Sequence, residues 1–266
     1  MKKIFLLSIF LIFNISLVFS QDLEKEKLST LGFGLGYSFS GYREVTVLDI
    51  NRYNNTLTFF IDGASEKKRL LHSYNIGFFR GKNDVEVAYP VYEWELYSGY
   101  GSTFIYYQTE DTFTRLNLEY ALDYRLWGNK IFPGYLGGAI RADIYLIQTL
   151  LNPIYINLTG VFSFNLHVGQ KWIINEKNIL SVSVSLPIVG FGIRPQYIGL
   201  AGWPIETGFV SYHNYFSLFG NIKYLHKFTP LFSLYSGLGF EFSRINFPRM
   251  RKDAATHINL GVAFIF

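Results

Sequence analysis

The sequence contains no cysteine. Its stability must therefore come from something other than disulfide bonds. It also carries little net charge, with a formal value of +4, which argues against a nucleic-acid partner. Beyond the first 20 residues no apolar run reaches 18 residues, so membrane-spanning helices are not expected. No linker rich in proline, glycine and serine divides the chain, and one domain is expected.

The first 20 residues have the pattern of a secretory signal. Two lysines precede a long apolar run, which ends in Val18-Phe19-Ser20 before Gln21. We expect residues 1–20 to be a signal peptide and residues 21–266 to form the exported domain. An uncleaved anchor helix is the alternative, because the apolar run is long. The run is not followed by a cysteine, so a lipoprotein anchor is excluded.

Aromatic residues are abundant, at 19% of the chain with 20 Tyr and 26 Phe, and apolar residues recur at every second position. In residues 31–40, Leu31, Phe33, Leu35, Tyr37 and Phe39 alternate with glycine and serine. The same period appears in residues 115–126, 136–146, 156–172, 180–188, 210–224, 232–244 and 257–266. A period of two predicts β-strands, since a helix would scatter these residues around its axis. Several segments exceed the nine to eleven residues that cross a bilayer as a tilted strand.

The segments between these strands alternate in length. Short polar turns are expected at 80–84, 128–134, 175–178 and 229–230, and longer connections at 42–67, 98–112, 148–155, 190–208 and 247–253. This rhythm predicts about ten strands, with both chain ends on the side of the short turns. Alternatively, residues 42–62 form an extra hairpin around Asn54-Asn55 or an extension above the membrane. The alternation changes parity near Tyr89-Pro90, where we expect a β-bulge. Eight or twelve strands are the alternatives.

A soluble β-sandwich would also have one apolar face per strand. Three features favour a membrane barrel instead. The polar face is rich in glycine, serine and asparagine, aromatic residues gather near both strand ends, and the last strand alternates to the end of the sequence. Its apolar positions are Ile258, Leu260, Val262, Phe264 and Phe266.

Together the signal peptide, the alternating strands, the rhythm of connections and Phe266 resemble the bacterial outer-membrane β-barrel class. The resemblance implies an all-β fold, a closed antiparallel transmembrane β-barrel in the outer membrane of a Gram-negative cell. It implies that Ile258, Leu260, Val262, Phe264 and Phe266 are the signal read by the barrel-assembly machinery. The last strand would then pair with the first, because an open edge in lipid leaves backbone groups unpaired. Outer-membrane lipid and lipopolysaccharide are the expected surroundings.

If the apolar faces meet lipid, the opposite faces line the lumen. The expected lumen-lining charged and polar residues are Arg115, Glu119, Asp123, Arg125, Arg141, Asp143, His167, Lys171, His213, Lys223 and Glu241. Both signs of charge lie on neighbouring strands. Paired charges would plug a narrow barrel, and unpaired ones would select solutes in a small pore. Ten strands are close to the size at which side chains fill the interior.

The sequence has no pattern that identifies an enzyme. Omptin proteases need paired aspartates, and no Asp-x-Asp occurs. A lipid hydrolase would need a serine beside a histidine; His167 is expected to approach Ser181 or Ser183 across the 175–178 turn. The five histidines lack metal-ligand spacing, and no cofactor is expected.

We therefore expect no catalytic residues and a non-enzymatic role, either structural or in binding a protein partner through the extracellular loops. A narrow pore for small solutes is the alternative, and a hydrolase or protease of the outer membrane is the third. The basic segment 247–252 would lie outside, either as a solvated cluster of charges, which is the commoner case, or in contact with lipopolysaccharide phosphates. Segment 190–208 would form a constriction at the mouth or a partner-binding surface.

Overall fold

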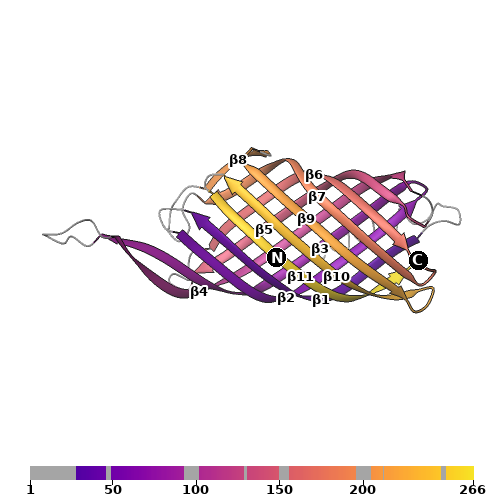
Figure 1. Ribbon diagram of the computed structural model, residues 1–266, viewed down its shortest axis with the longest axis horizontal. Helices are drawn as coiled ribbons and strands as arrows, with labels where there is room; N and C mark the ends of the chain where they lie inside the picture. The colour runs from indigo at the N-terminus through magenta and orange to yellow at the C-terminus, as the bar shows by residue number, and fades with distance from the viewer. Residues whose placement is uncertain are drawn as a thin grey trace, which may run out of the picture.

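A computed structural model describes residues 28–45, 49–92, 102–128, 131–149, 156–195, 205–211, 213–246 and 250–266. These residues form eleven strands (Figure 1). The strands are β1 (Leu28–Val45), β2 (Asp49–Lys67), β3 (Leu70–Tyr92), β4 (Ser102–Trp127), β5 (Gly134–Thr149), β6 (Ile156–Ile173), β7 (Asn178–Pro195), β8 (Ile205–Ser211), β9 (Tyr215–Lys227), β10 (Phe232–Asn246) and β11 (Met250–Ile265). The predicted signal peptide lies outside the described residues. Within the described ranges, no helix has the length and apolarity needed to cross a membrane.

The sheet closes on itself because β11 pairs antiparallel with β1, as predicted. Strand β7 pairs with β8 over its last residues and with β9 over its first. Between β8 and β9 the chain makes a local turn, in which the Ser211 amide donates to Asn214 Oδ1 at 2.7 Å. Because β8 and β9 run one after the other along the same side of β7, they form one pass of the wall. The fold is a closed antiparallel barrel of ten passes, and the predicted fold class is confirmed.

The two ends of the barrel differ. Four short turns lie at one end, together with the start of β1 and the end of β11. There the Phe266 amide donates to Ser29 O at 2.9 Å, and the Ser29 amide donates to Phe266 O at 3.1 Å. At the opposite end, on the left in Figure 1, the β3–β4 hairpin projects furthest along the long axis. Outer-membrane barrels have short turns on the periplasmic side, so the end with the hairpin is the outer one.

Residues 42–67 are not the predicted long connection. Strand β1 continues to Val45, and β2 pairs with it from Asp49 to Glu66. The turn that follows is the dipeptide Lys68–Arg69, where Lys68 has a positive φ of 55°. The polar composition of β2 suggested a loop because Arg52, Asn54, Thr56 and Thr58 point into a polar interior and are buried. The alternative of an extra hairpin around Asn54-Asn55 is wrong as well, because both residues lie inside β2 and pair with β1.

Residues 80–84 are not a turn either, because β3 runs through them to Tyr92. Arg80, Lys82 and Asp84 are exposed there because the strand has passed the apolar band. These two corrections offset each other, so the strand count of ten is unchanged. The strands also extend into each of the predicted long connections; β11, for example, begins at Met250.

The predicted bulge at Tyr89-Pro90 is wrong. Strand β3 pairs with β4 residue by residue through Pro90 and Phe104. A register shift occurs instead beside Pro187, where Asn165 pairs with Pro187 and the adjacent Phe164 pairs with Val189. Proline has no amide hydrogen to donate, so a break in the ladder suits it.

Candidate functional site

The middle of the barrel is crossed by an ion pair between opposite walls. In the ring of ten passes, β4 and β10 are five positions apart in either direction. Arg115 of β4 nevertheless donates to the Glu241 carboxylate of β10. Arg115 Nε also donates to Asp143 Oδ1 of the adjacent strand β5 at 2.8 Å. The interior is therefore narrow enough for side chains to meet across it.

A second arginine completes this network. Arg141 Nη2 lies 3.4 Å from Glu241 Oε2, and its Nη1 lies 3.1 Å from Glu119 Oε2. His257 Nε2 is 3.7 Å from the same Glu241 oxygen. Arg115, Arg141, Asp143 and Glu241 are all buried. We call Arg115, Glu119, Arg141, Asp143 and Glu241 the central ion network.

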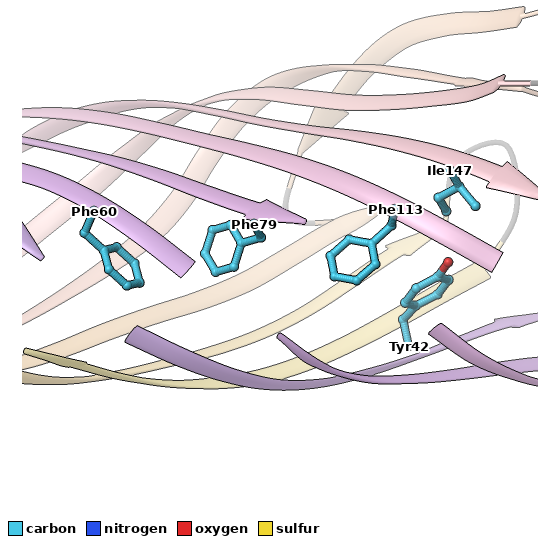
Figure 2. Packing of buried hydrophobic residues seen from close by; sticks show 5 residues of the cluster. All are labelled: Tyr42, Phe60, Phe79, Phe113 and Ile147. Atoms are coloured by element: carbon cyan, nitrogen blue, oxygen red, sulfur yellow. The ribbon is translucent and has the colours of Figure 1, made fainter. Parts of the chain in front are cut away.

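Aromatic side chains fill the space beside and outward of the central ion network. Figure 2 shows the buried cluster of Tyr42, Phe60, Phe79, Phe113 and Ile147 arranged along the interior. The Arg115 guanidinium lies 5.3 Å from the centre of the Phe79 ring. Stacking of this kind suits arginine, whose planar charge is weakly hydrated. Beside these groups the interior retains only a small cavity of about 20 Å³, lined by Phe113, Arg115 and Glu241 among others.

The outer part of the lumen holds another polar layer. Arg52 Nε donates to Asp111 Oδ2 at 2.7 Å, and Asn54 Nδ2 donates to Asn83 Oδ1 at 2.9 Å. Arg251 Nε donates to Asp253 Oδ1 at 2.7 Å. These contacts pair polar groups inside the barrel, where an unpaired polar group is costly.

A cavity of about 160 Å³ lies on the periplasmic side of the central ion network. Its walls combine polar side chains with aromatic rings such as Phe60 and Tyr235. Two ion pairs lie at this level: Lys171 Nζ contacts Glu66 Oε2 at 3.0 Å, and Lys223 contacts Asp62. Tyr135 also donates to Glu66 Oε1 at 2.6 Å. The cavity can admit a small polar molecule, but the central ion network separates it from the outer end.

One histidine and one aspartate in this cavity form a dyad. His167 Nδ1 lies 2.8 Å from Asp123 Oδ2 and 2.9 Å from Oδ1, and both side chains are buried. A carboxylate on Nδ1 orients the ring and leaves Nε2 for proton transfer. Ser181 and Ser183 line the same cavity. The residue paired directly with His167 is Ser185, whose hydroxyl accepts a hydrogen bond from Asn165.

The structure places ten of the eleven predicted lumen residues inside the barrel. Four residues of the central ion network lie on the neighbouring strands β4 and β5, and Glu241 lies on the opposite wall. Asp123, His167, Lys171 and Lys223 surround the cavity, and Arg125 lies 4.0 Å from Glu66. His213 is the exception: it is exposed in the turn between β8 and β9, where the strand alternation is interrupted.

Several interior residues escaped prediction because their segments were expected to be loops. They are Arg52, Asn54, Asp62 and Glu66 of β2, Asn83 of β3, Asp111 of β4, Arg194 of β7 and Arg251 of β11. The alternation of β2 was detectable in the sequence. Apolar residues stand at every second position, at Tyr53, Leu57 and Phe59, and only Asn55 interrupts the series. Within the described residues, no three metal-ligating side chains are arranged to hold a metal ion.

The outer wall is apolar over a continuous band. Exposed residues of this band include Leu35, Leu57, Ile140, Phe164 and Leu260. Towards the short turns the band carries exposed Tyr124, Trp127 and Tyr224. Exposing an apolar surface of this extent to water would be unfavourable. The band and its aromatic edge are those expected of a barrel wall that faces the acyl chains and the interface of a bilayer. Of the predicted assembly signal, Ile258, Leu260, Phe264 and Phe266 are exposed on this wall; their recognition by the assembly machinery stays a prediction.

Comparison with solved structures gives barrels of the same kind. The outer-membrane protease OmpT from Escherichia coli matches with a TM-score of 0.56 and 9% identity, over 93% of this chain and 100% of that chain. The chain has the fold of an outer-membrane β-barrel. An outer-membrane channel from Pseudomonas putida F1 matches with a TM-score of 0.42 and 9% identity, over 92% of this barrel and 97% of the channel. Neisserial surface protein A gives 0.37 and 9%, over 89% and 97%. Neither a family model nor a curated protein matches the sequence.

Proposed function

We propose that this protein is a closed, non-enzymatic outer-membrane barrel. Its role would be structural, or would consist of binding a partner through the extracellular loops, and it would not conduct solutes. The observation that carries this proposal is the contact of Arg115 with Glu241 across the full width of the barrel. Charged groups with partners on the opposite wall occupy the path that a solute or ion would take.

The burial of these charges supports a stable closure. The Arg115 and Glu241 side chains are each only 4% exposed, and Arg141 and Asp143 bracket them. Breaking one member would leave an uncompensated buried charge, which costs about 3–5 kcal/mol. Thermal fluctuations of the side chains therefore open this layer rarely.

Conductance of the refolded protein in a planar bilayer tests the proposal. Refolding is first confirmed by the faster gel migration of unheated samples. We expect no steady openings from the wild type. A matched variant, Arg115→Gly with Glu241→Gly, removes one charge of each sign, while Arg141 still lies 3.9 Å from Asp143 and 3.1 Å from Glu119. It should show small, steady openings. Steady openings of the wild type would overturn the proposal and favour the small-solute pore.

A hydrolase is the second candidate, favoured by the dyad of His167 and Asp123. The dyad lies in a cavity with two serine hydroxyls, so a general base and candidate nucleophiles share one space. Hydrolysis of an ester reaching the cavity from the periplasmic side is the reaction class that such a group supports. The alternative role of the dyad is structural, as a buried ion pair in the wall.

Ester hydrolysis by the refolded protein separates these two roles. The hydrolase predicts turnover of a short-chain nitrophenyl ester that falls at least a hundredfold in His167→Gln, since general-base catalysis contributes about that factor or more. His226→Gln is the matched control, because His226 lies in β9 and hydrogen-bonds to Asn178 outside the cavity. Equal background rates in wild type and both variants would exclude the hydrolase.

A further inference from the structure

Two amide side chains line the periplasmic cavity from opposite walls. Asn75 lies on β3 and Asn221 on β9, which are five positions apart in the ring of ten passes. Within the described ranges neither amide group makes a hydrogen bond, and the same holds for the hydroxyl groups of Ser73 and Ser183 in this cavity. Asn259 Oδ1 is buried at the cavity wall without a partner among the described residues. Amides and hydroxyls both donate and accept hydrogen bonds, so these groups are available to a guest molecule.

The charged side chains at this level are already paired with each other. The pairs are Lys171 with Glu66, Lys223 with Asp62, His167 with Asp123 and Arg141 with Glu119. A charged guest would displace one of these partners and leave a buried charge uncompensated, which is strongly unfavourable. A neutral guest with several hydrogen-bonding groups does not incur this cost.

The size of the cavity and the apolar part of its wall fit a single sugar ring. The cavity measures about 160 Å³, and a cavity of about 150 Å³ in another protein holds benzene, a six-membered ring. Phe60 and Tyr235 supply aromatic surface to the wall, against which C–H groups can pack. A six-membered sugar has hydroxyl groups around its edge and C–H groups on its faces, so it matches both kinds of wall.

Solvent reaches the cavity from the periplasmic end. Lys171 and Glu66 lie close to the ends of β6 and β2, beside the short turns, and their side chains are each 22% exposed. The Asp123 side chain, which lies further from its turn, is fully buried. Because the central ion network separates the cavity from the outer end, a guest enters from the periplasm.

We propose that the periplasmic cavity binds one neutral sugar ring. Asn75 and Asn221 bind hydroxyl groups at opposite edges of the ring, and Phe60 and Tyr235 contact its C–H groups. The proposal rests on this cavity alone. It therefore holds whether or not the lumen conducts, and whether the histidine dyad is catalytic or structural.

Saturation-transfer NMR of the refolded protein, in a detergent without sugar groups, tests the proposal. The neutral probes are D-glucose, D-galactose and D-mannose, and we expect at least one of them to bind saturably. The amino sugar and the uronic acid of the same ring carry a positive and a negative charge. They should bind on the order of tenfold more weakly or worse, since each would leave a buried charge unpaired. Asn221→Ala should weaken binding of the neutral sugar about fivefold, because a neutral hydrogen bond contributes about that factor.

Gly169→Leu fills the cavity, and Gly160→Leu on the same strand is its matched control. Gly169 lines the cavity, and apart from its chain neighbours a Cβ there would meet no atom nearer than 3.8 Å. The leucine side chain therefore takes the space of the sugar. Gly160 lies on the outward face between exposed Leu158 and Phe162, and a Cβ there would meet no atom nearer than 3.9 Å. We expect Gly169→Leu to lose saturable binding and Gly160→Leu to keep the affinity of the wild type.

Three results would overturn the proposal. They are the absence of saturable binding by all three neutral sugars, equal binding of a charged analogue, and binding retained in Gly169→Leu. The comparison of sugars uses the wild type alone, so it decides even if a variant does not refold.

Discussion

Glu241 joins both arginines of the central ion network. Its two oxygens are shared between Arg115 and Arg141, and His257 approaches from β11. The alternation of β10 predicted correctly that Glu241 faces inward. It did not predict the partners, because Arg115 lies 126 residues away in the sequence. Charges on opposite walls meet only when the sheet closes.

The variant Glu241→Gln tests the importance of this shared carboxylate. It keeps the shape of the side chain and removes the charge, so two buried guanidinium groups lose their common partner. We expect the free energy of unfolding to fall by about 3–5 kcal/mol. Urea unfolding in phospholipid vesicles, followed by tryptophan fluorescence, measures this change.

Glu110→Gln is the control for that experiment, since it also removes one carboxylate from an ion pair. The Lys82 and Glu110 side chains are 67% and 49% exposed, so water replaces the lost contact. We expect a much smaller change than for Glu241→Gln. Similar losses in both variants would show that the central ion network contributes no more than a surface pair.

At the scale of the strand, one face of each strand lies against the polar interior and the other against lipid. In β5 the inward residues Arg141 and Asp143 are buried, and the outward residues Ile140 and Leu146 are exposed on the apolar wall. This pattern was read correctly wherever the outward face was uniformly apolar. It was misread in β2 and β3, where polar residues occupy the inward face or the segment beyond the bilayer. A polar residue at those places resembles a loop residue.

The depth of an outward position sets the cost of a charge there. Ile140→Arg places a guanidinium near the middle of the apolar band, where the cost is about 2–4 kcal/mol. Gln148→Arg places the same group on the same strand and face, at the outer edge of the band, where the cost is about 0–1 kcal/mol. Urea unfolding in vesicles measures both. Equal costs would contradict the assigned position of the bilayer.

At the scale of the whole molecule, ten passes give a barrel that its own side chains can close. An eight-stranded barrel is filled by its side chains, and barrels of sixteen or more strands enclose a channel. In this barrel long side chains from different walls meet in the interior, as Arg115 meets Glu241 and Arg141 meets the Phe219 ring. Its interior is therefore close to that of an eight-stranded barrel. The expected silence in a planar bilayer follows from this filling.

The paired variant Arg115→Gly with Glu241→Gly tests the same closure. If the central ion network is the barrier, removing the Arg115–Glu241 contact across the lumen should connect the periplasmic cavity with the outer end. A variant that refolds and stays silent would move the barrier to the outer layer around Arg52 and Asp111.

The sequence by itself determined the class of the protein and the facing of most strands. Alternation with a period of two is a local property, and it is enough to separate lipid-facing from inward-facing residues. Of the eleven residues that this pattern placed on the lumen side, ten lie inside the barrel. His213 was misassigned because the strand is interrupted there, and the interruption depends on how β7 divides its pairing between β8 and β9.

The tertiary structure alone decided which inward residues meet. Register and closure bring Arg115 to Glu241, His167 to Asp123 and Lys171 to Glu66, and these contacts separate a closed lumen from an open one. They also bring Asn75 and Asn221 to opposite walls of one cavity. Such contacts join residues far apart in sequence, so their positions depend on the curvature and stagger of the entire sheet.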